Sequence, residues 1–207
     1  LLPVVDTPTP KATDCDPNRR LLDACQWLRA MKPRNKEYMI AAPLTARPAT
    51  PADAQAMVEI YNEGIADRIA TFETTPRSVD QLADWFDSNH PIVVVMDDPG
   101  HVVGYAATFP YADRCCYAGI AEFSVYVRRA NRGQGVGAIA MNALIDAATV
   151  AGFWKLLSRV FVENKASLAL LKSVGFREVG VHEKHGMLDG VWRDVVATER
   201  LLDTNLG

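Results

Sequence analysis

The sequence predicts an α/β protein with a central mixed β-sheet and helices on both faces. Apolar runs of strand length alternate with segments of helical periodicity along most of the chain. Two of those runs flank the turn signal Asp97-Asp98-Pro99-Gly100, which is typical of an antiparallel hairpin. A later strand-helix-strand unit requires parallel strands. We therefore expect a sheet that is parallel only in its middle.

The first half of the domain is expected to contain one strand, two helices and a hairpin. Thr50-Pro51-Ala52-Asp53 supplies an N-cap, a proline at the first helical position and an acid in the first turn. Ser78 and Gln81 form a second capping box, which predicts another helix start. The expected elements are a strand over 44–47, a helix over 50–64, a helix from 78 to about 86, and strands over 92–96 and 102–109.

The second half should contain the strand-helix-strand unit, a further helix and a final pair of strands. The apolar residues that we expect on the buried face of the unit's helix are Ile139, Ala140, Ala143, Leu144 and Ala147. The expected elements are a strand over 121–127, a helix over 137–150, a strand over 156–162, a helix over 166–174 that Gly175 stops, and two strands around the turn 188–190.

Composition limits the class of protein and excludes several functions. The chain has 207 residues, 49% hydrophobic and 23% charged, which suits one domain with an appendage. We expect the proline-rich residues 1–43 to be the appendage, with one short helix, and residues 44–207 to be the functional domain. A net charge of -3 argues against a nucleic-acid partner held by bulk positive charge. No run approaches the roughly 20 apolar residues of a membrane span, so we expect no membrane partner.

The cysteines and histidines predict a reducing, cytoplasmic compartment and no metal site. Cys15, Cys25, Cys115 and Cys116 show no CxxC spacing. We expect the adjacent pair to be small hydrophobic packing, since no third ligand follows at a suitable spacing. His182-Glu-Lys-His185 lacks a helix that would align its two imidazoles on a metal.

The loop Arg132-Gly-Gln-Gly-Val-Gly137 carries the strongest functional signal. It lies between an expected strand and an expected helix, so several backbone N–H groups and the positive helix end converge there. Arg128 and Arg129 precede it and, with Arg132, would add guanidinium groups suited to phosphate oxygens. The arrangement predicts a pyrophosphate-binding loop.

Two other phosphate-binding motifs fit this loop less well. A P-loop is excluded because no Gly-Lys-[Ser/Thr] ends the motif. A nicotinamide dinucleotide remains an alternative, because Gly133-x-Gly135-x-x-Ala138 satisfies the GxGxxA form and Glu163 closes the next strand. Too few residues follow Glu163, however, to supply the further α/β units of a doubly wound sheet.

At this loop the sequence resembles the GNAT superfamily of N-acetyltransferases, whose acetyl-CoA loop has the form [Arg/Gln]-x-x-Gly-x-[Gly/Ala]. The resemblance covers about residues 44–202. Within the superfamily, the sequence is similar to the branch of phosphinothricin and arsinothricin N-acetyltransferases. It implies a GNAT-like fold, acetyl-CoA as co-substrate, a small amino-acid acceptor and a homodimer. Five segments carry it, namely 47–53, 70–76, 121–127, 132–137 and 164–176.

On the cofactor side, the resemblance implies that the strand at 121–127 offers backbone groups to the pantetheine arm. The glycine loop would wrap the pyrophosphate, and the helix after 163 would touch the cofactor. The implied cofactor-binding residues are Val125, Tyr126, Val127, Arg132, Gly133, Gln134, Gly135, Val136, Gly137, Ala138, Asn164 and Ser173.

On the acceptor side, the resemblance implies that Glu122 is the general base and that Arg114 binds an acidic group of the acceptor. A carboxylate in an apolar strand beside the loop could accept the ammonium proton, although a solvent-facing residue in alternation with Ser124 and Tyr126 is the other interpretation. The implied substrate-binding residues are Phe72, Thr74, Arg114, Tyr117, Glu122, Phe123 and Ser124.

Leu171 stands where relatives carry a tyrosine or histidine that could protonate the leaving thiolate. Leucine cannot donate a proton, so the thiolate would leave unassisted or through water. We predict an N-acetyltransferase that acetylates the α-amino group of phosphinothricin or arsinothricin directly in a ternary complex and so confers resistance. The alternatives are another amine, such as methionine sulfone, methionine sulfoximine or a peptide N-terminus, and a non-catalytic acetyl-CoA-binding module.

Overall fold

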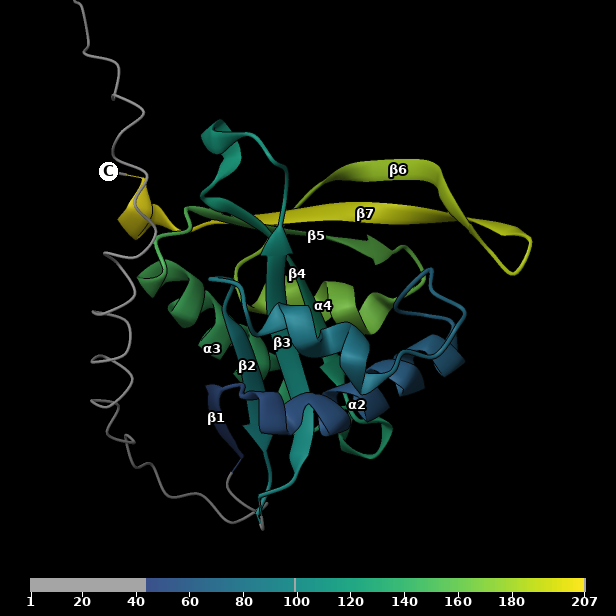
Figure 1. The fold of residues 1–207 in the computed structure, drawn as a ribbon. Helices are drawn as coiled ribbons and strands as arrows, with labels where there is room; N and C mark the ends of the chain where they lie inside the picture. Colours follow the sequence, from purple (N-terminus) through teal and green to yellow (C-terminus); the bar gives the residue numbers. More distant parts are fainter. Residues whose placement is uncertain (1–43, 99, 207) are drawn as a thin grey trace, which may run out of the picture. The chain divides into compact units, whose positions relative to one another are not determined.

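The computed structural model describes residues 44–98 and 100–206. The expected appendage over 1–43, with its helix, lies outside the described residues. In the described part, seven strands form one sheet in the order β1-β2-β3-β4-β5-β7-β6 (Figure 1). The strands are β1 (Thr45–Pro48), β2 (Ile92–Met96), β3 (Val102–Pro110), β4 (Ile120–Val127), β5 (Lys155–Phe161), β6 (Arg177–Leu188) and β7 (Val191–Leu201).

Within the described residues, only β4 and β5 pair in parallel. The other neighbouring strands of the sheet are antiparallel. The mixed sheet that is parallel only in its middle is therefore confirmed. The β4-β5 step is the crossover that the strand-helix-strand unit requires, because parallel neighbours cannot be joined by a tight turn.

The helices cover both faces of the sheet (Figure 1). Adjacent residues of β2 enter different cores, Val93 and Val95 on one face and Ile92 and Val94 on the other, as the period-two alternation of a strand requires. The α-helices of the described residues are α2 (Ala54–Asp67), α3 (Val136–Val150) and α4 (Lys165–Ser173).

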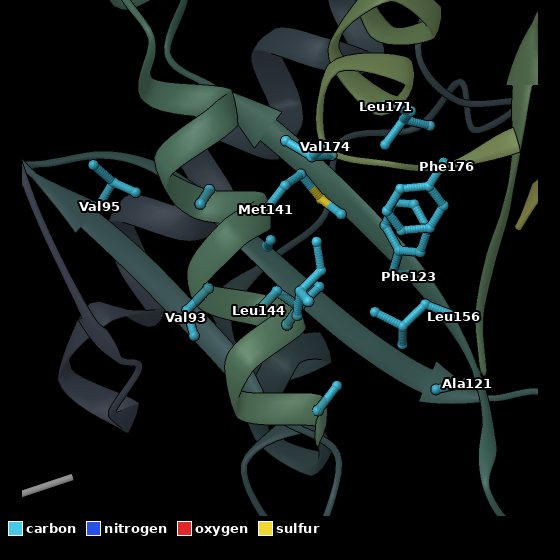
Figure 2. Close-up of a cluster of buried hydrophobic side chains, with 14 of the residues drawn as sticks. Val93, Val95, Ala121, Phe123, Met141, Leu144, Leu156, Leu171, Val174 and Phe176 are labelled. Atoms are coloured by element: carbon cyan, nitrogen blue, oxygen red, sulfur yellow. The ribbon is translucent and has the colours of Figure 1, made fainter. Parts of the chain in front are cut away.

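The face with α3 and α4 holds the larger core (Figure 2). Met141 and Leu144 of α3 lie against the sheet, and Phe123 of β4 packs on Phe176 with ring centroids 4.9 Å apart. Leu171 of α4 lies in the same cluster. This packing fixes the start of α3, and with it the glycine loop, at the end of β4.

The predicted buried face of α3 is only partly correct. Ala140 and Leu144 are fully buried, but Ile139, Ala143 and Ala147 are half-buried. Because α3 is apolar around most of its circumference, polarity alone does not identify the face that meets the sheet. The buried residues of α3 are Val136, Ala140, Met141, Leu144, Ile145 and Ala148.

The segment after Ser78 also differs from the prediction in its helix type. The capping box between Ser78 and Gln81 is present, but Val79–Trp85 forms a 3₁₀ helix. Leu82 is buried and Trp85, three positions later, is partly buried against the same core, a spacing that a 3₁₀ helix also aligns.

Strand β6 is largely exposed, and the β6-β7 hairpin lies at one edge of the sheet (Figure 1). Among the helices that the structure describes, none has both the length and the apolar character of a membrane span. The exposed large apolar residues of this hairpin are Val179, Val181, Met187, Val191, Trp192 and Leu201.

Candidate active site

A cavity opens where β4 and β5 separate. The two strands pair at three positions, from Ile120 opposite Lys155 to Glu122 opposite Leu157. Beyond Glu122, β4 continues along β3 and β5 continues along β7. The space between them has a volume of about 680 Å³ and is lined by residues 122–126 of β4 and 158–161 of β5.

The separation exposes one edge of β4. The β5-facing N–H and C=O groups after Glu122 have no strand partner in the described residues, so an extended ligand can pair with them as a strand would. Val125 and Tyr126 line the cavity. The carbonyl of Val127 is already occupied, because Arg132 Nε donates to it at 3.1 Å.

The glycine loop folds tightly at the start of α3. Gly133 and Gly135 have φ angles of 75° and 85°, in the left-handed region that glycine adopts at little cost. A Cβ added at either position would meet no atom within 4 Å, so the loop borders open space. The first N–H groups of α3 have no partner within the helix and are available to an anion.

Gly137 has a different function from the other two glycines. A Cβ there would lie 2.9 Å from Cδ2 of Leu170, so its small size allows α3 and α4 to approach each other. Gln134 points back along the loop and donates to the Ala130 carbonyl at 2.9 Å. Val136 is buried in the core, and Ala138 is half-buried in the first turn of α3.

The arginines around the loop cluster as predicted, but acids of α2 pair with them. Arg129 and Arg132 each place a guanidinium nitrogen 2.5 Å from Asp67, and Arg128 pairs with Glu59 at 3.3 Å. Burial raises the pKa of Asp67, but hydrogen bonds from Arg129 and Arg132 outweigh it and hold that pKa below its usual value. These cations are therefore partly neutralised before any ligand binds.

Glu122 lines the cavity and forms an ion pair with Arg159 of β5. The side chain of Glu122 is 30% exposed and that of Arg159 is 43% exposed. Phe123 and Ser124 line the same cavity. Tyr126, expected on the same face as Glu122, is buried and packs on Tyr61 with ring centroids 4.7 Å apart.

The predicted acceptor residues do not all meet at this cavity. Phe72 lines it and makes an edge-to-face contact with Phe161, with centroids 4.7 Å apart. Thr74 is exposed and is not among the lining residues. Arg114 and Tyr117 lie on the exposed loop between β3 and β4, also outside the lining set, and Tyr117 packs on Tyr111 at 5.6 Å.

That loop also contains Cys115 and Cys116, which are free thiols and are exposed. The prediction that they serve as hydrophobic packing is wrong, because their short 3₁₀ helix lies on the surface of the loop and buries none of its residues. Within the described residues, no group of three or more His, Cys, Asp or Glu side chains is arranged for a metal ion.

The two residues expected from the following helix have structural contacts. Asn164 lines the cavity and caps α4. Its side-chain Oδ1 accepts from Ser167 N at 3.1 Å, and its side-chain Nδ2 donates to Ile69 O at 3.0 Å. Ser173 is exposed at the end of α4, outside the lining set, and donates to the Leu170 carbonyl at 2.7 Å.

Three residues at the site were missed or misjudged from the sequence. Arg159 lies in β5 with Lys155 and Ser158, so a charged residue did not stand out in this strand. Asp67 gave no signal, because its partners are far away in the sequence. His185, considered only as part of a metal motif, lines the cavity with its ring centroid 6.4 Å from that of Phe72. Leu171 is buried and also lines the cavity.

Comparison with known proteins identifies the family. Residues 57–176 match the model of the acetyltransferase (GNAT) family. The chain belongs to the GNAT family of acetyltransferases. Its sheet, which opens between β4 and β5 next to a glycine loop, is the GNAT fold, and a nicotinamide-binding fold is thereby excluded.

Relatives and solved structures agree on the activity of this GNAT protein. It is 32% identical to the L-methionine sulfoximine/L-methionine sulfone acetyltransferase of Pseudomonas aeruginosa over 161 residues, which cover 76% of this chain and 94% of the relative. It is 28% identical to the phosphinothricin N-acetyltransferase of Streptomyces coelicolor over 167 residues, or 78% and 98% of the two chains.

Among solved structures, a phosphinothricin acetyltransferase from Sinorhizobium meliloti in complex with acetyl-CoA superposes with a TM-score of 0.73. It is 31% identical, and the match covers 77% of this chain and 88% of that one. The protein is therefore an acetyl-CoA-dependent N-acetyltransferase.

The site's own geometry fits acetyl-CoA. Open space borders Gly133 and Gly135 at the start of α3, where N–H groups are available to a pyrophosphate. The unpaired edge of β4 leads from this loop toward Glu122, and a pantetheine arm is an extended chain with amide groups that can pair with such an edge. Acetyl-CoA supplies the activated acetyl group, and Glu122 lies where this edge begins, at the last β4 position paired with β5.

Proposed function

We propose that this enzyme acetylates the α-amino group of a small acidic amino-acid analogue, with phosphinothricin or arsinothricin as acceptor, and so confers resistance to it. The observation that carries the proposal is a carboxylate, Glu122, in the cavity where β4 and β5 separate. Further support comes from relatives named for acetylation of phosphinothricin, methionine sulfoximine and methionine sulfone. We assign the acetyltransferase domain to residues 44–207.

Glu122 is the general base in this proposal. An α-ammonium group has no free electron pair at neutral pH, so a base must remove a proton before the nitrogen can attack. Overall, an N–C bond forms and the thioester C–S bond breaks. The ammonium loses two protons, of which one leaves through Glu122 to solvent and the other ends on the sulfur of CoA.

The remaining polar functions fall to the backbone and to water. N–H groups on the free edge of β4, between Phe123 and Val127, donate to the thioester oxygen as negative charge develops there. Leu171 offers no proton to the leaving sulfur, so water protonates it. Residues 132–138 hold the pyrophosphate, while Asn164 and Ser173 flank the cofactor from α4.

The acceptor site in this proposal is completed by a second copy of the chain. Arg114 and Tyr117 lie on an exposed loop, beside the exposed Tyr111. The β6-β7 hairpin also exposes large apolar side chains that a homodimer would cover. In the dimer, Arg114 binds an anionic group of the acceptor, and Phe72, Thr74 and Tyr117 surround it. Exposed thiols at Cys115 and Cys116 fit a reducing, cytoplasmic compartment.

The direct test is a thiol-release assay with purified protein, acetyl-CoA and a panel of amines. The panel contains phosphinothricin, arsinothricin, methionine sulfone, methionine sulfoximine and a short peptide. Fast release with an acidic analogue supports the proposal. Faster release with a sulfone or a peptide shifts the function to that acceptor, and no release despite acetyl-CoA binding indicates a non-catalytic module.

A further inference from the structure

The cavity contains one permanent cation. Among its lining residues, all from the described part of the chain, Arg159 is the only lysine or arginine. The other titratable carboxyl and imidazole side chains that line it are Glu73, Glu122 and His185. An anionic acceptor group inside this cavity therefore has a single arginine to bind within the same subunit.

Arg77, which contacts Glu73 of the cavity lining, is not available to a ligand. Arg77 makes two hydrogen bonds to Glu73, one of them 2.8 Å from Nε to Oε2, and its guanidinium lies 5.0 Å from the centroid of the Tyr61 ring. Hydrogen bonding from Arg77 outweighs burial and lowers the pKa of Glu73. Glu73 thus stays ionised and paired, and the two charges cancel.

The ion pair between Arg159 and Glu122 has fewer hydrogen bonds than the pair between Arg77 and Glu73. Within the described residues, the guanidinium of Arg159 makes one hydrogen bond, from Nη2 to Oε1 of Glu122. A guanidinium has five N–H donors, so four are left for a ligand. Both side chains are partly exposed, and exposed pairs of this kind are held loosely. The pair can therefore open when a better anion arrives.

Opening the pair has a consequence for Glu122. While Arg159 donates to Oε1 of Glu122, that oxygen is occupied and is not open to the ammonium group of an acceptor. An acceptor anion that attracts Arg159 also leaves Glu122 without its partner. Binding of the acidic group and release of the base are then one event.

We propose that Arg159 is a specificity-determining residue, which moves from Glu122 to the side-chain anion of the acceptor and frees Glu122 to accept the ammonium proton. The inference rests on the proposed function and adds the substrate class to it, namely amino acids whose side chain ends in a carboxylate, phosphinate or arsinate. Planar N–H pairs of a guanidinium suit each of these anions. The α-carboxylate, which neutral and acidic acceptors share, is left to Arg114.

The test uses two acceptors of nearly equal shape and different charge. Phosphinothricin ends in an anionic methylphosphinate, and methionine sulfone ends in a neutral methylsulfone. kcat and KM are measured for both in wild type, Arg159→Met, Arg159→Lys and Arg177→Met. Arg177 is the matched control, since it pairs with Glu199 on the same sheet and does not line the cavity. Acetyl-CoA titration and thermal unfolding verify that each variant is folded.

Arg159→Met should lower kcat/KM for phosphinothricin by at least about tenfold, because a charge-assisted contact is lost. It should raise kcat for methionine sulfone, because in wild type a neutral acceptor does not draw Arg159 away from Glu122. The kcat/KM of Arg159→Lys for phosphinothricin should lie between those of wild type and Arg159→Met, and that of Arg177→Met should equal the wild-type value.

Two results would overturn the inference. An equal loss for both acceptors in Arg159→Met would mean that Arg159 only positions Glu122, and no loss for either would remove it from the site. If wild type acetylates neither of these acceptors nor arsinothricin, the proposed function fails, and this inference fails with it. If wild type acetylates both acceptors and Arg159→Met leaves the ratio of their kcat/KM values unchanged, the inference is refuted while the proposed function stands.

Discussion

Arg132, at the start of the glycine loop, is ion-paired with Asp67 near the end of α2, with 2.5 Å between Nη1 and Oδ2. The same arginine donates from Nε to the carbonyl of Val127. One side chain therefore connects three elements: the loop, the end of β4 and helix α2. The loop is held in place by α2, and its cations meet a phosphate group only in competition with Asp67.

The first prediction concerns that competition. Asp67→Asn removes one negative charge beside the loop and should tighten acetyl-CoA binding about two- to threefold at low ionic strength. The gain should disappear at high salt, where such charges are screened. Calorimetric titration at two salt concentrations measures both effects, with Asp203→Asn, an exposed acid after β7, as control. Weaker binding in Asp67→Asn would show instead that Asp67 orients the arginines for the cofactor.

The second prediction concerns the base. Glu122→Gln keeps the size of the side chain but cannot accept a proton at neutral pH. We expect kcat to fall about 10²- to 10⁴-fold, the usual contribution of a general base, with the Kd of acetyl-CoA unchanged. Steady-state kinetics and a separate binding titration provide the two values. Losses of similar size in both would argue against Glu122 as the base.

The third prediction concerns the glycine loop. Gly135 has a φ of 85°, so Gly135→Ala strains the loop by about 1–2 kcal/mol and should weaken acetyl-CoA binding about tenfold. Gly180→Ala on β6 is a matched control, because a Cβ there meets nothing within 4 Å and its φ is not in the left-handed region. Fluorescence titration of both variants tests the difference. Equal affinities would mean that the loop's shape does not matter for binding.

The fourth prediction separates Arg114 from Arg159. Arg114→Ala should raise the acceptor KM about 10- to 100-fold for phosphinothricin and methionine sulfone alike, because both carry the α-carboxylate assigned to it. The KM of acetyl-CoA should stay constant. A selective loss for phosphinothricin would assign the side-chain anion to Arg114, and an unchanged KM would remove Arg114 from the acceptor site.

The fifth prediction concerns stability and pH. Two hydrogen bonds from Arg47, each 2.7 Å, outweigh burial and hold the pKa of Asp53 below its ordinary value. A lowered folded-state pKa stabilises the protein above the unfolded-state pKa of about 4, and this stabilisation is lost as the pH falls through the folded-state pKa. Asp53→Asn should therefore lower the free energy of unfolding by about 1.5–3 kcal/mol at pH 7.

Urea unfolding of wild type and Asp53→Asn at a series of pH values checks this prediction. The difference between the two proteins should shrink below about pH 4, where the unfolded carboxyl is protonated. A difference that stays constant over the whole range would mean that Asp53 acts through packing and not through its charge.

Local signals were sufficient to predict the elements and most of the topology. Strand alternation, the capping residues at Thr50 and Ser78, and the turn signal after β2 each depend on neighbours within a few positions, so they can be recognised without a structure. The order of a hairpin followed by a strand-helix-strand unit then implied a parallel pair in the middle of the sheet. The glycine loop followed from the same logic, since its position between a strand and a helix is local.

The amino-acid sequence by itself thus determined the fold class; it also predicted a loop that suits a pyrophosphate and, through the family resemblance, Glu122 as the base. Only the tertiary structure decided the partners of the charged side chains. Glu122 meets Arg159 across 37 positions, and Arg132 meets Asp67 across 65. Such pairs depend on strand register and on where β4 and β5 separate, which is set by the packing of the whole sheet against its helices. For that reason Arg159 lies in the cavity while Arg114, on a surface loop, does not.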